Sequence, residues 1–268
     1  MSEIPSLLLV GCGRMGGAML AGWRERGLSA SFAVDPAPDA VRNAGSDLTV
    51  VADLSAVPAD FAPAAVVLAV KPQSAAEALP AYARFAGSAV FLSIMAGRTI
   101  AGIQALLGGS AAVVRAMPNT PAAVRQGITV ATPSPTVTSA QRELCGDLLR
   151  AIGLVEWVER EALLDPVTAV SGSGPAYVFL LAELMEQAAI EQGIAPDLAR
   201  ILARQTVAGS GALLAASQES AAELRKAVTS PGGTTQAALE VLMAPDAVPK
   251  AFSEAIAAAT RRSRELAG

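Results

Sequence analysis

The stretch LLLVGCGRMG at residues 7–16 decides the fold of this chain. Its apolar first part predicts a short buried strand, and the glycine-rich turn after it opens a helix predicted over residues 15–26. Gly11 permits a tight turn, Gly13 lets a phosphate approach the backbone, and Gly16 lets the helix pack closely on the strand. The N–H groups that begin the helix can then bind a pyrophosphate. An ordinary glycine-rich turn is the alternative.

An acidic residue, Asp35, follows the second expected strand, residues 32–34. In dinucleotide-binding folds an acid at this place, about 20 residues after the glycines, can hydrogen-bond a ribose 2′-OH and would repel a 2′-phosphate. This favours NADH over NADPH as the cofactor, although Arg42 could still reach a phosphate. The alternative is that Asp35 is a helix N-cap beside Pro36.

Two further segments are expected at the same edge of the sheet, because each ends a strand where ligands bind in such folds. The first follows the strand expected at residues 65–70, and the second flanks the nicotinamide after the strand at residues 89–94. Lys71 could instead be a solvated strand-end lysine. The candidate cofactor-binding residues are Gly11, Cys12, Gly13, Arg14, Met15, Gly16, Asp35, Ala69, Val70, Lys71, Pro72 and Ala96.

The first part of the chain alternates between strands and helices. Further strands are expected at residues 50–52, 112–116, 127–131 and 155–158, and helices at 74–85, 100–107 and 139–152. This alternation predicts a parallel sheet with helices on both faces. We therefore expect an α/β fold in which residues 1–160 form a doubly wound, Rossmann-type dinucleotide-binding domain.

Beyond residue 160 the pattern becomes helical. Helices are predicted at residues 175–192, 196–217 and 248–266, with a shorter one opened by the capping box Ser220-x-x-Glu223. Residues 161–268 are thus expected to form an all-α domain. Small residues at 208–211 would let another helix approach closely, and each glycine there costs about 1 kcal/mol of helix stability. This favours a packing role, and we expect a homodimer formed through this domain.

Composition excludes several classes of protein. The 268 residues are 52% hydrophobic and 16% charged, but no apolar run approaches the ~18 residues of a membrane span. The net charge is −4 and the only basic cluster, at residues 261–264, looks like a cationic helix end, so no nucleic-acid or membrane partner is expected. With two cysteines, no histidine and no signal peptide, we expect a cytoplasmic protein without disulfides or a metal site.

A second anion site is expected at VTSPGGTT, residues 228–235. Two glycines let the backbone bend, and the hydroxyls of Thr234 and Thr235 lie at favoured capping positions of the helix that follows. Free N–H groups at the positive end of that helix dipole suit a small carboxylate substrate. A purely structural cap is the alternative.

Together these segments resemble the pyrroline-5-carboxylate reductase family, and the match is carried by residues 11–16, 69–72, 115–121, 164–179 and 230–235. The resemblance implies a Rossmann domain with a helical dimerisation domain, dimers that often assemble into decamers, and NAD(P)H-dependent reduction of 1-pyrroline-5-carboxylate to L-proline, the last step of proline biosynthesis. It implies Thr235 as the catalytic residue. The substrate would be bound by Glu161, Ser230, Gly232, Gly233, Thr234 and Thr235.

The absence of histidine fits this reaction, because a protonated cyclic imine is already electrophilic and mainly needs positioning. Asp35 departs from the resemblance, since the family commonly has a hydroxyl, Asn or Arg near there and often uses NADPH. Other functions are a broader imine reductase and a non-catalytic NAD(P)-binding regulatory protein. A β-hydroxyacid dehydrogenase would need a lysine on the helix entering the second domain, and the only lysines are Lys71, Lys226 and Lys250.

Overall fold

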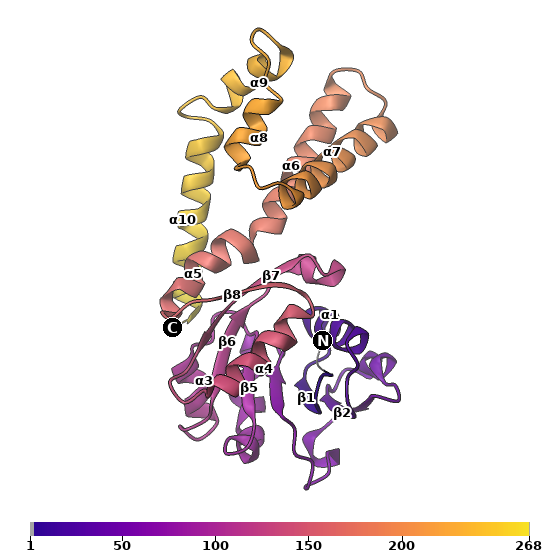
Figure 1. Cartoon of the computed structure of the whole chain (residues 1–268), viewed down its shortest axis with the longest axis vertical. Coiled ribbons are helices and arrows are strands. Elements are labelled where there is room, and N and C mark those ends of the chain that lie inside the picture. Colours follow the sequence, from indigo (N-terminus) through magenta and orange to yellow (C-terminus); the bar gives the residue numbers. More distant parts are fainter. Residues whose placement is uncertain (1–2, 268) are drawn as a thin grey trace. The chain divides into compact units, whose positions relative to one another are not determined.

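The computed structural model describes residues 3–267 and divides into two compact units (Figure 1). Unit 1 holds the chain up to Gly172 and the segment that starts at Ala259, and unit 2 is Ser173–Ala258. The boundary between the two units therefore lies after Gly172, further along the chain than the boundary expected near residue 160. The reason is that Leu164 and Ala169 are buried among the side chains of unit 1.

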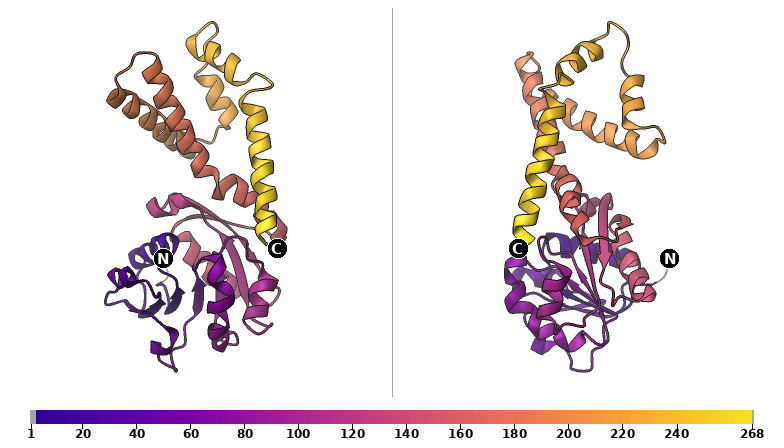
Figure 2. Two further views of the ribbon diagram at one scale, coloured as in Figure 1. Left: turned by 180° about the vertical axis from the view of Figure 1, so that it is seen from behind. Right: turned by 90° about the vertical axis from the view of Figure 1, so that its left-hand side faces the viewer.

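Unit 1 is built on one sheet with the strand order β3-β2-β1-β4-β5-β6-β7-β8 (Figures 1 and 2). The expected strands are all present, with ends that shift by a few residues. They are β1 (Leu7–Val10), β2 (Ser31–Val34), β3 (Leu48–Val51), β4 (Ala65–Leu68), β5 (Val90–Ser93), β6 (Val113–Met117), β7 (Gly127–Pro133) and β8 (Gly153–Trp157).

One strand departs from the expected all-parallel sheet. Strand β7 runs antiparallel to β6, with Ala116 opposite Ala131, whereas β8 is parallel to β7. A parallel neighbour needs a crossover of about a dozen residues or more, usually a helix. The connection from β6 to β7 holds only a 3₁₀ turn, η5 (Thr120–Val124), so the chain returns beside β6 in the opposite direction.

The core lies on both faces of this sheet, because successive residues of a buried strand point to opposite sides. Leu7 and Leu9 of β1 pack in one cluster with α1 (Arg14–Glu25) and α4 (Ser139–Arg150). Leu8 and Val10 face the other cluster with α3 (Ile100–Leu106) and the segment before β5. These two layers make unit 1 a doubly wound α/β fold.

The helix expected at residues 74–85 is interrupted. A single turn, α2 (Ala75–Ala78), is followed by the 3₁₀ segment η4 (Leu79–Phe85), whose second residue is Pro80. Proline has no N–H to donate and its ring clashes with the carbonyl four residues earlier, so it ends a regular α-helix.

After β8 the described chain, through residue 267, contains helices and no strand. Unit 1 takes η6 (Glu161–Leu163), α5 (Leu164–Val167) and a π-helical turn, η7 (Thr168–Gly172). Five helices begin in unit 2, and the last of them, α10, continues into unit 1. They are α6 (Gly174–Glu191), α7 (Pro196–Ala216), α8 (Ala221–Ala227) and α9 (Thr234–Leu242), and the last helix is α10 (Val248–Ala267).

Unit 2 leaves many apolar side chains exposed, including Phe179 at 67% and Ile201 at 62%. The helical stretch Glu161–Glu191 is long and apolar enough to cross a membrane by length and composition, because an 18-residue window within it has a mean hydropathy of 1.3. The expectation of no membrane partner therefore stays a prediction. An exposed apolar helix face is also what a subunit interface presents before its partner covers it.

Candidate active site

The glycine-rich turn is closely packed against the end of strand β4. Gly11 has φ +97°, and a Cβ on it would lie 2.8 Å from the carbonyl oxygen of Ala69. A Cβ on Gly16 would collide with the carbonyl oxygen of Gly11. Gly13 differs, because no described atom beyond the adjacent residues lies within 4 Å of the place its Cβ would take. Two glycines thus serve packing, and the third leaves open space in front of the backbone.

That open space lies at the start of α1, where a pyrophosphate fits. Gly13 is the N-cap, no side chain caps the helix, and the first turn carries no acidic residue. The N–H groups of Arg14, Met15 and Gly16 have no partner inside the helix, since the first turn of any helix lacks them. The residues present therefore fit a dinucleotide cofactor, held at its pyrophosphate by these N–H groups.

Asp35 is fixed beside this turn. Its Oδ2 accepts a hydrogen bond from the Cys12 N–H at 2.6 Å, and its Oδ1 accepts one from the Ala37 N–H at 2.9 Å. The short helix after it has Ala37 as its N-cap, so the alternative of Asp35 as a helix cap is not what the structure shows. Burial, and then the charge of Asp35, raise the pKa of the Cys12 thiol to about 11.

The two strand-end segments expected to face the cofactor are tied together. Residues 69–72 follow β4, and Ala96 lies in the loop between β5 and α3, residues 94–99, which we call the β5–α3 loop. Arg98 of this loop donates to the Pro72 carbonyl from Nε at 2.9 Å and Nη2 at 2.7 Å. Lys71 is exposed. The predicted cofactor residues therefore gather at the carboxyl edge of the parallel strands.

Glu161, expected in the substrate site, lies in unit 1 with its carboxylate engaged. Its Oε1 accepts from Arg115 Nη1 at 2.7 Å and from the Ile100 N–H, at the start of α3, at 2.8 Å. Arg115 is buried, with 6% of its surface exposed. This network was missed from the sequence, where the signal was an arginine inside the apolar strand VVRAM. A role of Glu161 toward substrate stays a prediction.

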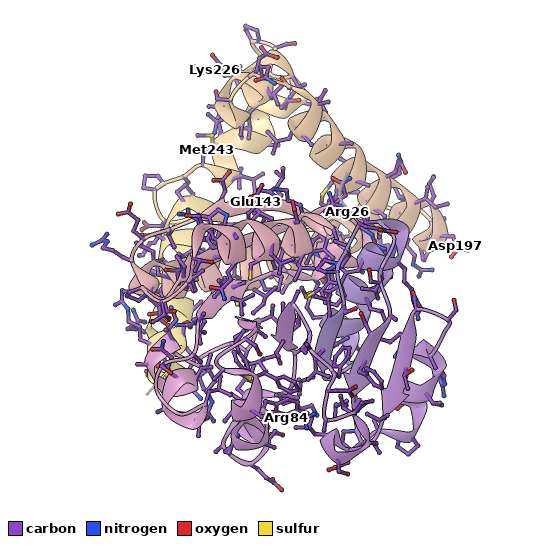
Figure 3. All side chains as sticks on the ribbon, turned by 60° about the horizontal axis from the view of Figure 1, so that its bottom comes forward. Arg26, Arg84, Glu143, Asp197, Lys226 and Met243 are labelled. Carbon is purple, nitrogen blue, oxygen red and sulfur yellow. The ribbon has the colours of Figure 1, made fainter. Side chains whose placement is uncertain are left out.

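The other predicted substrate residues surround the start of α9 in unit 2. Along the chain they lie between Lys226 and Met243, which Figure 3 labels. The expectation that Thr234 and Thr235 cap this helix was wrong. Gly233 is the N-cap, no side chain caps the helix, and the two threonines are its first two residues. Gly233 has an extended backbone (φ −85°, ψ 172°), and neither of the two hydroxyls that follow it makes a capping hydrogen bond.

Two N–H groups of this loop already have acceptors. The Gly232 N–H donates to Gln236 Oε1 at 2.7 Å, and the Gly233 N–H donates to the Ser230 carbonyl at 3.0 Å. Gly232 has φ +69°, which a side chain would strain. The donors left for an anion are those of Thr234, Thr235 and Gln236, in the first turn of α9.

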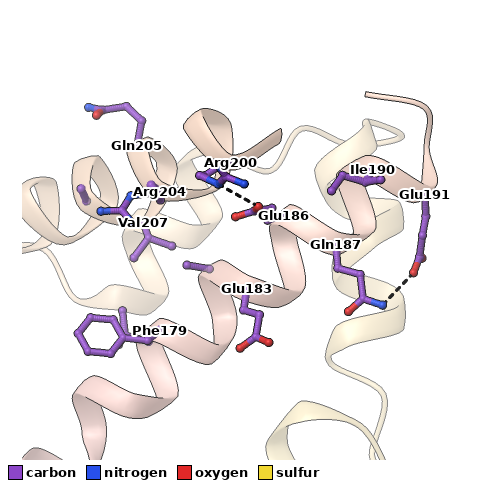
Figure 4. A pocket seen from close by; sticks show the side chains of 13 residues that line it. Phe179, Glu183, Glu186, Gln187, Ile190, Glu191, Arg200, Arg204, Gln205 and Val207 are labelled. Carbon is purple, nitrogen blue, oxygen red and sulfur yellow. Dashed lines mark hydrogen bonds and ion pairs between the residues drawn. The ribbon is translucent and has the colours of Figure 1, made fainter. Parts of the chain in front are cut away.

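A groove in unit 2 lies between α6 and α7 and contains none of the predicted site residues (Figure 4). Apolar residues such as Phe179 and Val207 line it together with charged ones, and Arg200 Nε pairs with Glu186 Oε1 at 3.3 Å. Its lining is helix surface without the convergent donors of the two glycine turns.

Two family profiles match the chain. The one described as pyrroline-5-carboxylate reductase dimerisation covers residues 161–266, and the one described as NADP oxidoreductase coenzyme F420-dependent covers residues 6–97. The first thus covers all of unit 2, and the second covers the glycine-rich turn, Asp35 and Ala96. The chain therefore carries a nicotinamide-dinucleotide domain and a dimerisation domain.

Relatives match over nearly the full length. The pyrroline-5-carboxylate reductase of Pseudomonas aeruginosa is 38% identical, over 98% of this chain and 97% of its own length. The solved structure of such a reductase from Coxiella burnetii is 32% identical, with a TM-score of 0.90 over 99% of both chains. The Plasmodium falciparum reductase with NADP bound is 26% identical, with a TM-score of 0.84 over 100% of both chains. By identity, coverage and fold, this chain belongs to the pyrroline-5-carboxylate reductase family.

Proposed function

We propose that this protein reduces 1-pyrroline-5-carboxylate to L-proline with a reduced nicotinamide dinucleotide, the last step of proline biosynthesis. The observation that carries the proposal is a pair of helix N-termini, α1 and α9, each capped by a glycine and by no side chain. Two such anion sites suit a dinucleotide pyrophosphate and a carboxylate substrate. Residues 1–160 would bind the dinucleotide, and residues 161–268 the substrate and a second subunit.

The start of α9 would hold the substrate. We assign the carboxylate to the N–H groups of Thr234 and Thr235, since those of Gly232 and Gly233 have acceptors within the loop. Ser230 and the two glycines shape the loop. The Thr235 hydroxyl, which caps nothing, would hydrogen-bond the ring nitrogen and orient the imine. Glu161 would also bind substrate, as the resemblance to the family implies.

The chemistry needs little from the protein beyond positioning. When bound, the reduced nicotinamide supplies a hydride, and the protonated imine supplies an electrophilic carbon. Thr235 then fixes the ring nitrogen, which keeps its proton as the C=N bond becomes a single bond. Holding the two reacting atoms at near-attack distance can account for several kcal/mol of barrier lowering, about 7–11 kcal/mol in the best model systems.

Asp35 supports NADH as the preferred coenzyme. Its carboxylate is held at the end of β2 by two N–H groups, and it keeps acceptor capacity for a ribose hydroxyl. A 2′-phosphate at the same place would meet this negative charge. NADPH is the competing choice, because one matching family profile is that of NADP oxidoreductases and the Plasmodium falciparum relative binds NADP.

We further propose a cytoplasmic homodimer that is able to assemble into a decamer. The exposed apolar side chains of α6 and α7 would be covered by the second subunit. Apart from the adjacent residues and the nearby backbone of α7, no described atom lies within 4 Å of the Cβ positions of Gly209 and Gly211, which leaves room for a partner helix. Light scattering that finds a monomer at micromolar concentration would refute the dimer, and one that finds only dimers would refute the decamer.

The experiment that tests the function is oxidation of NADH and of NADPH in parallel by the purified protein with racemic 1-pyrroline-5-carboxylate. We expect turnover with both and a higher kcat/KM with NADH. A matched control uses a cyclic imine without the carboxylate, which should react slowly because it lacks the group that α9 binds. Equal rates on both imines would point to a broader imine reductase. No turnover with either coenzyme, while both bind, would point to a regulatory protein.

A further inference from the structure

The last turns of α10 pack against the β5–α3 loop, and we propose that they position this loop for the nicotinamide. α10 belongs to unit 2 as far as Ala258, whereas the segment from Ala259 packs within unit 1. From sequence this segment looked like no more than a cationic helix end. The proposal rests on the proposed function in one respect, the placing of Ala96 beside the nicotinamide.

Ser263 anchors the segment. It is the one buried residue of α10 among those described, with 8% of its surface exposed. Its Oγ donates a hydrogen bond to Asp165 Oδ1 at 2.8 Å. This hydrogen bond fixes the rotation of the helix end about its axis, because the buried Ser263 hydroxyl keeps its partner only while it faces Asp165.

Leu266 carries the contact to the loop. Gly97 has φ +70°, and a Cβ on it would lie 3.0 Å from the Leu266 carbonyl oxygen and 3.4 Å from the Leu266 Cβ. The backbone of the loop therefore lies directly on the last turn of α10, with no room for a side chain between them. Ala96, the neighbouring residue assigned to the nicotinamide, is exposed.

The loop is held by hydrogen bonds at its other contacts. Arg98 donates twice to the Pro72 carbonyl, and the Ile100 N–H that follows the loop donates to Glu161. The contact of Gly97 with Leu266 is a packing contact, so it depends on how firmly α10 is anchored. Ser263 and Leu266 are therefore positioning residues that act through the loop.

This arrangement predicts that loosening the end of α10 affects catalysis but not coenzyme binding. The pyrophosphate and ribose contacts lie at α1 and Asp35, so coenzyme affinity should not depend on α10. The nicotinamide end depends on the loop, and a small misplacement of a reacting group costs much of the rate. Loosening the helix end should therefore lower kcat and leave the coenzyme Kd nearly unchanged.

The first test uses hydrogen exchange in the protein without coenzyme. In Ser263→Ala we expect amide exchange of residues 94–99 to rise about fivefold, the factor given by one lost hydrogen bond of average strength. Residues 11–16 should not change, Ser263→Thr should restore the wild-type rate, and Ser253→Ala, on the exposed part of α10, is the matched control. Unchanged exchange at 94–99, or an equal rise at 11–16, would overturn the proposal.

The second test follows the fluorescence of bound reduced coenzyme without substrate. We expect Ser263→Ala to lower the nicotinamide emission of the complex while the Kd stays within about twofold. The same variant should lower kcat several-fold and raise the isotope effect of coenzyme deuterated at the transferred position. Identical emission in variant and wild type would refute the proposal. Because this readout needs no turnover, it is independent of whether pyrroline-5-carboxylate is the substrate.

Discussion

The chain has two glycine-capped helix N-termini that are built in opposite ways. At α1 the turn is packed against the sheet, so that a Cβ on Gly11 or Gly16 would meet backbone atoms. At α9 no described atom beyond the adjacent residues lies within 4 Å of a Cβ on Gly232, and a Cβ on Gly233 would meet mainly Ser230 of its own loop. The first site is therefore shaped by the fold of unit 1, and the second by its own short-range hydrogen bonds.

The two helix N-termini therefore depend on different parts of the protein, α1 on packing against the sheet and α9 on hydrogen bonds within its own loop. A rigid turn keeps its N–H groups aligned before a ligand arrives, which lowers the cost of binding. An open loop has only bonds such as that from Gly232 to Gln236 to hold its shape. We expect changes at α1 to act through packing and changes at α9 to act through chemistry.

The largest effect is expected for Gly16→Ala. Its methyl group would collide with the Gly11 carbonyl oxygen, which should lower the free energy of unfolding by roughly 1–3 kcal/mol and abolish coenzyme binding. Gly13→Ala is the matched control, because open space surrounds that position, so Tm should hold while coenzyme affinity falls. Calorimetry measures the Tm of the two variants, and coenzyme titration measures their coenzyme affinity. A Gly16→Ala protein with a normal Tm would contradict the conclusion that close packing shapes the turn at α1.

Thr235→Ala should have the next largest effect. Loss of one hydrogen bond made in the transition state should lower kcat/KM by roughly 10–100-fold, with little change in Tm. Thr235→Ser keeps the hydroxyl and should recover most of the rate. Steady-state kinetics with pyrroline-5-carboxylate test this, and an unchanged kcat/KM in Thr235→Ala would remove the residue from the catalytic role.

Asp35→Ser should change the choice of coenzyme by about tenfold, the factor for one charged contact of about 1.4 kcal/mol. Removing the carboxylate ends the repulsion of a 2′-phosphate, so the ratio of kcat/KM for NADPH to that for NADH should rise. Asp39→Ser, on the exposed 3₁₀ turn nearby, is the control. If the ratio of kcat/KM for NADPH to that for NADH stays constant in Asp35→Ser, Asp35 does not contact the ribose 2′ position.

The smallest effect is expected at the ion pair of Arg24 with Asp47, which ties α1 to the approach of β3 at 2.7 Å. The hydrogen bond from Arg24 lowers the pKa of Asp47, so the pair stabilises the fold above the ordinary carboxyl pKa and is lost as the pH falls through the lowered value. Asp47→Asn should cost about 1 kcal/mol or less at pH 7.

This stability difference should vanish in strong acid, which Tm measured as a function of pH will show. The matched control is Asp246→Asn in unit 2, whose partner Lys250 lies at 3.3 Å with the carboxylate 91% exposed, and it should leave Tm unchanged. If Asp47→Asn lowers Tm more in acid than at neutral pH, the ion pair does not explain the stability difference.

Much of the molecule could be predicted from sequence because its signals are local. The apolar run before Gly11 predicted β1, and the capping box of Ser220 with Glu223 predicted the start of α8, where both reciprocal hydrogen bonds are found. The doubly wound fold and the all-helical part followed from the same periodicities. Glycine spacing also indicated the two turns that open α1 and α9, since backbone freedom is a property of the residue itself.

Features that depend on partners distant in sequence could not be predicted and were found in the folded protein. The tertiary structure turned β7 antiparallel to β6, gave the cap of α9 to Gly233 in place of the threonines, and placed the Glu161 carboxylate on Arg115. It also brought the end of α10 to the β5–α3 loop. A sequence shows which groups can form a bond, but burial and the competition among all acceptors within reach select the bonds that form.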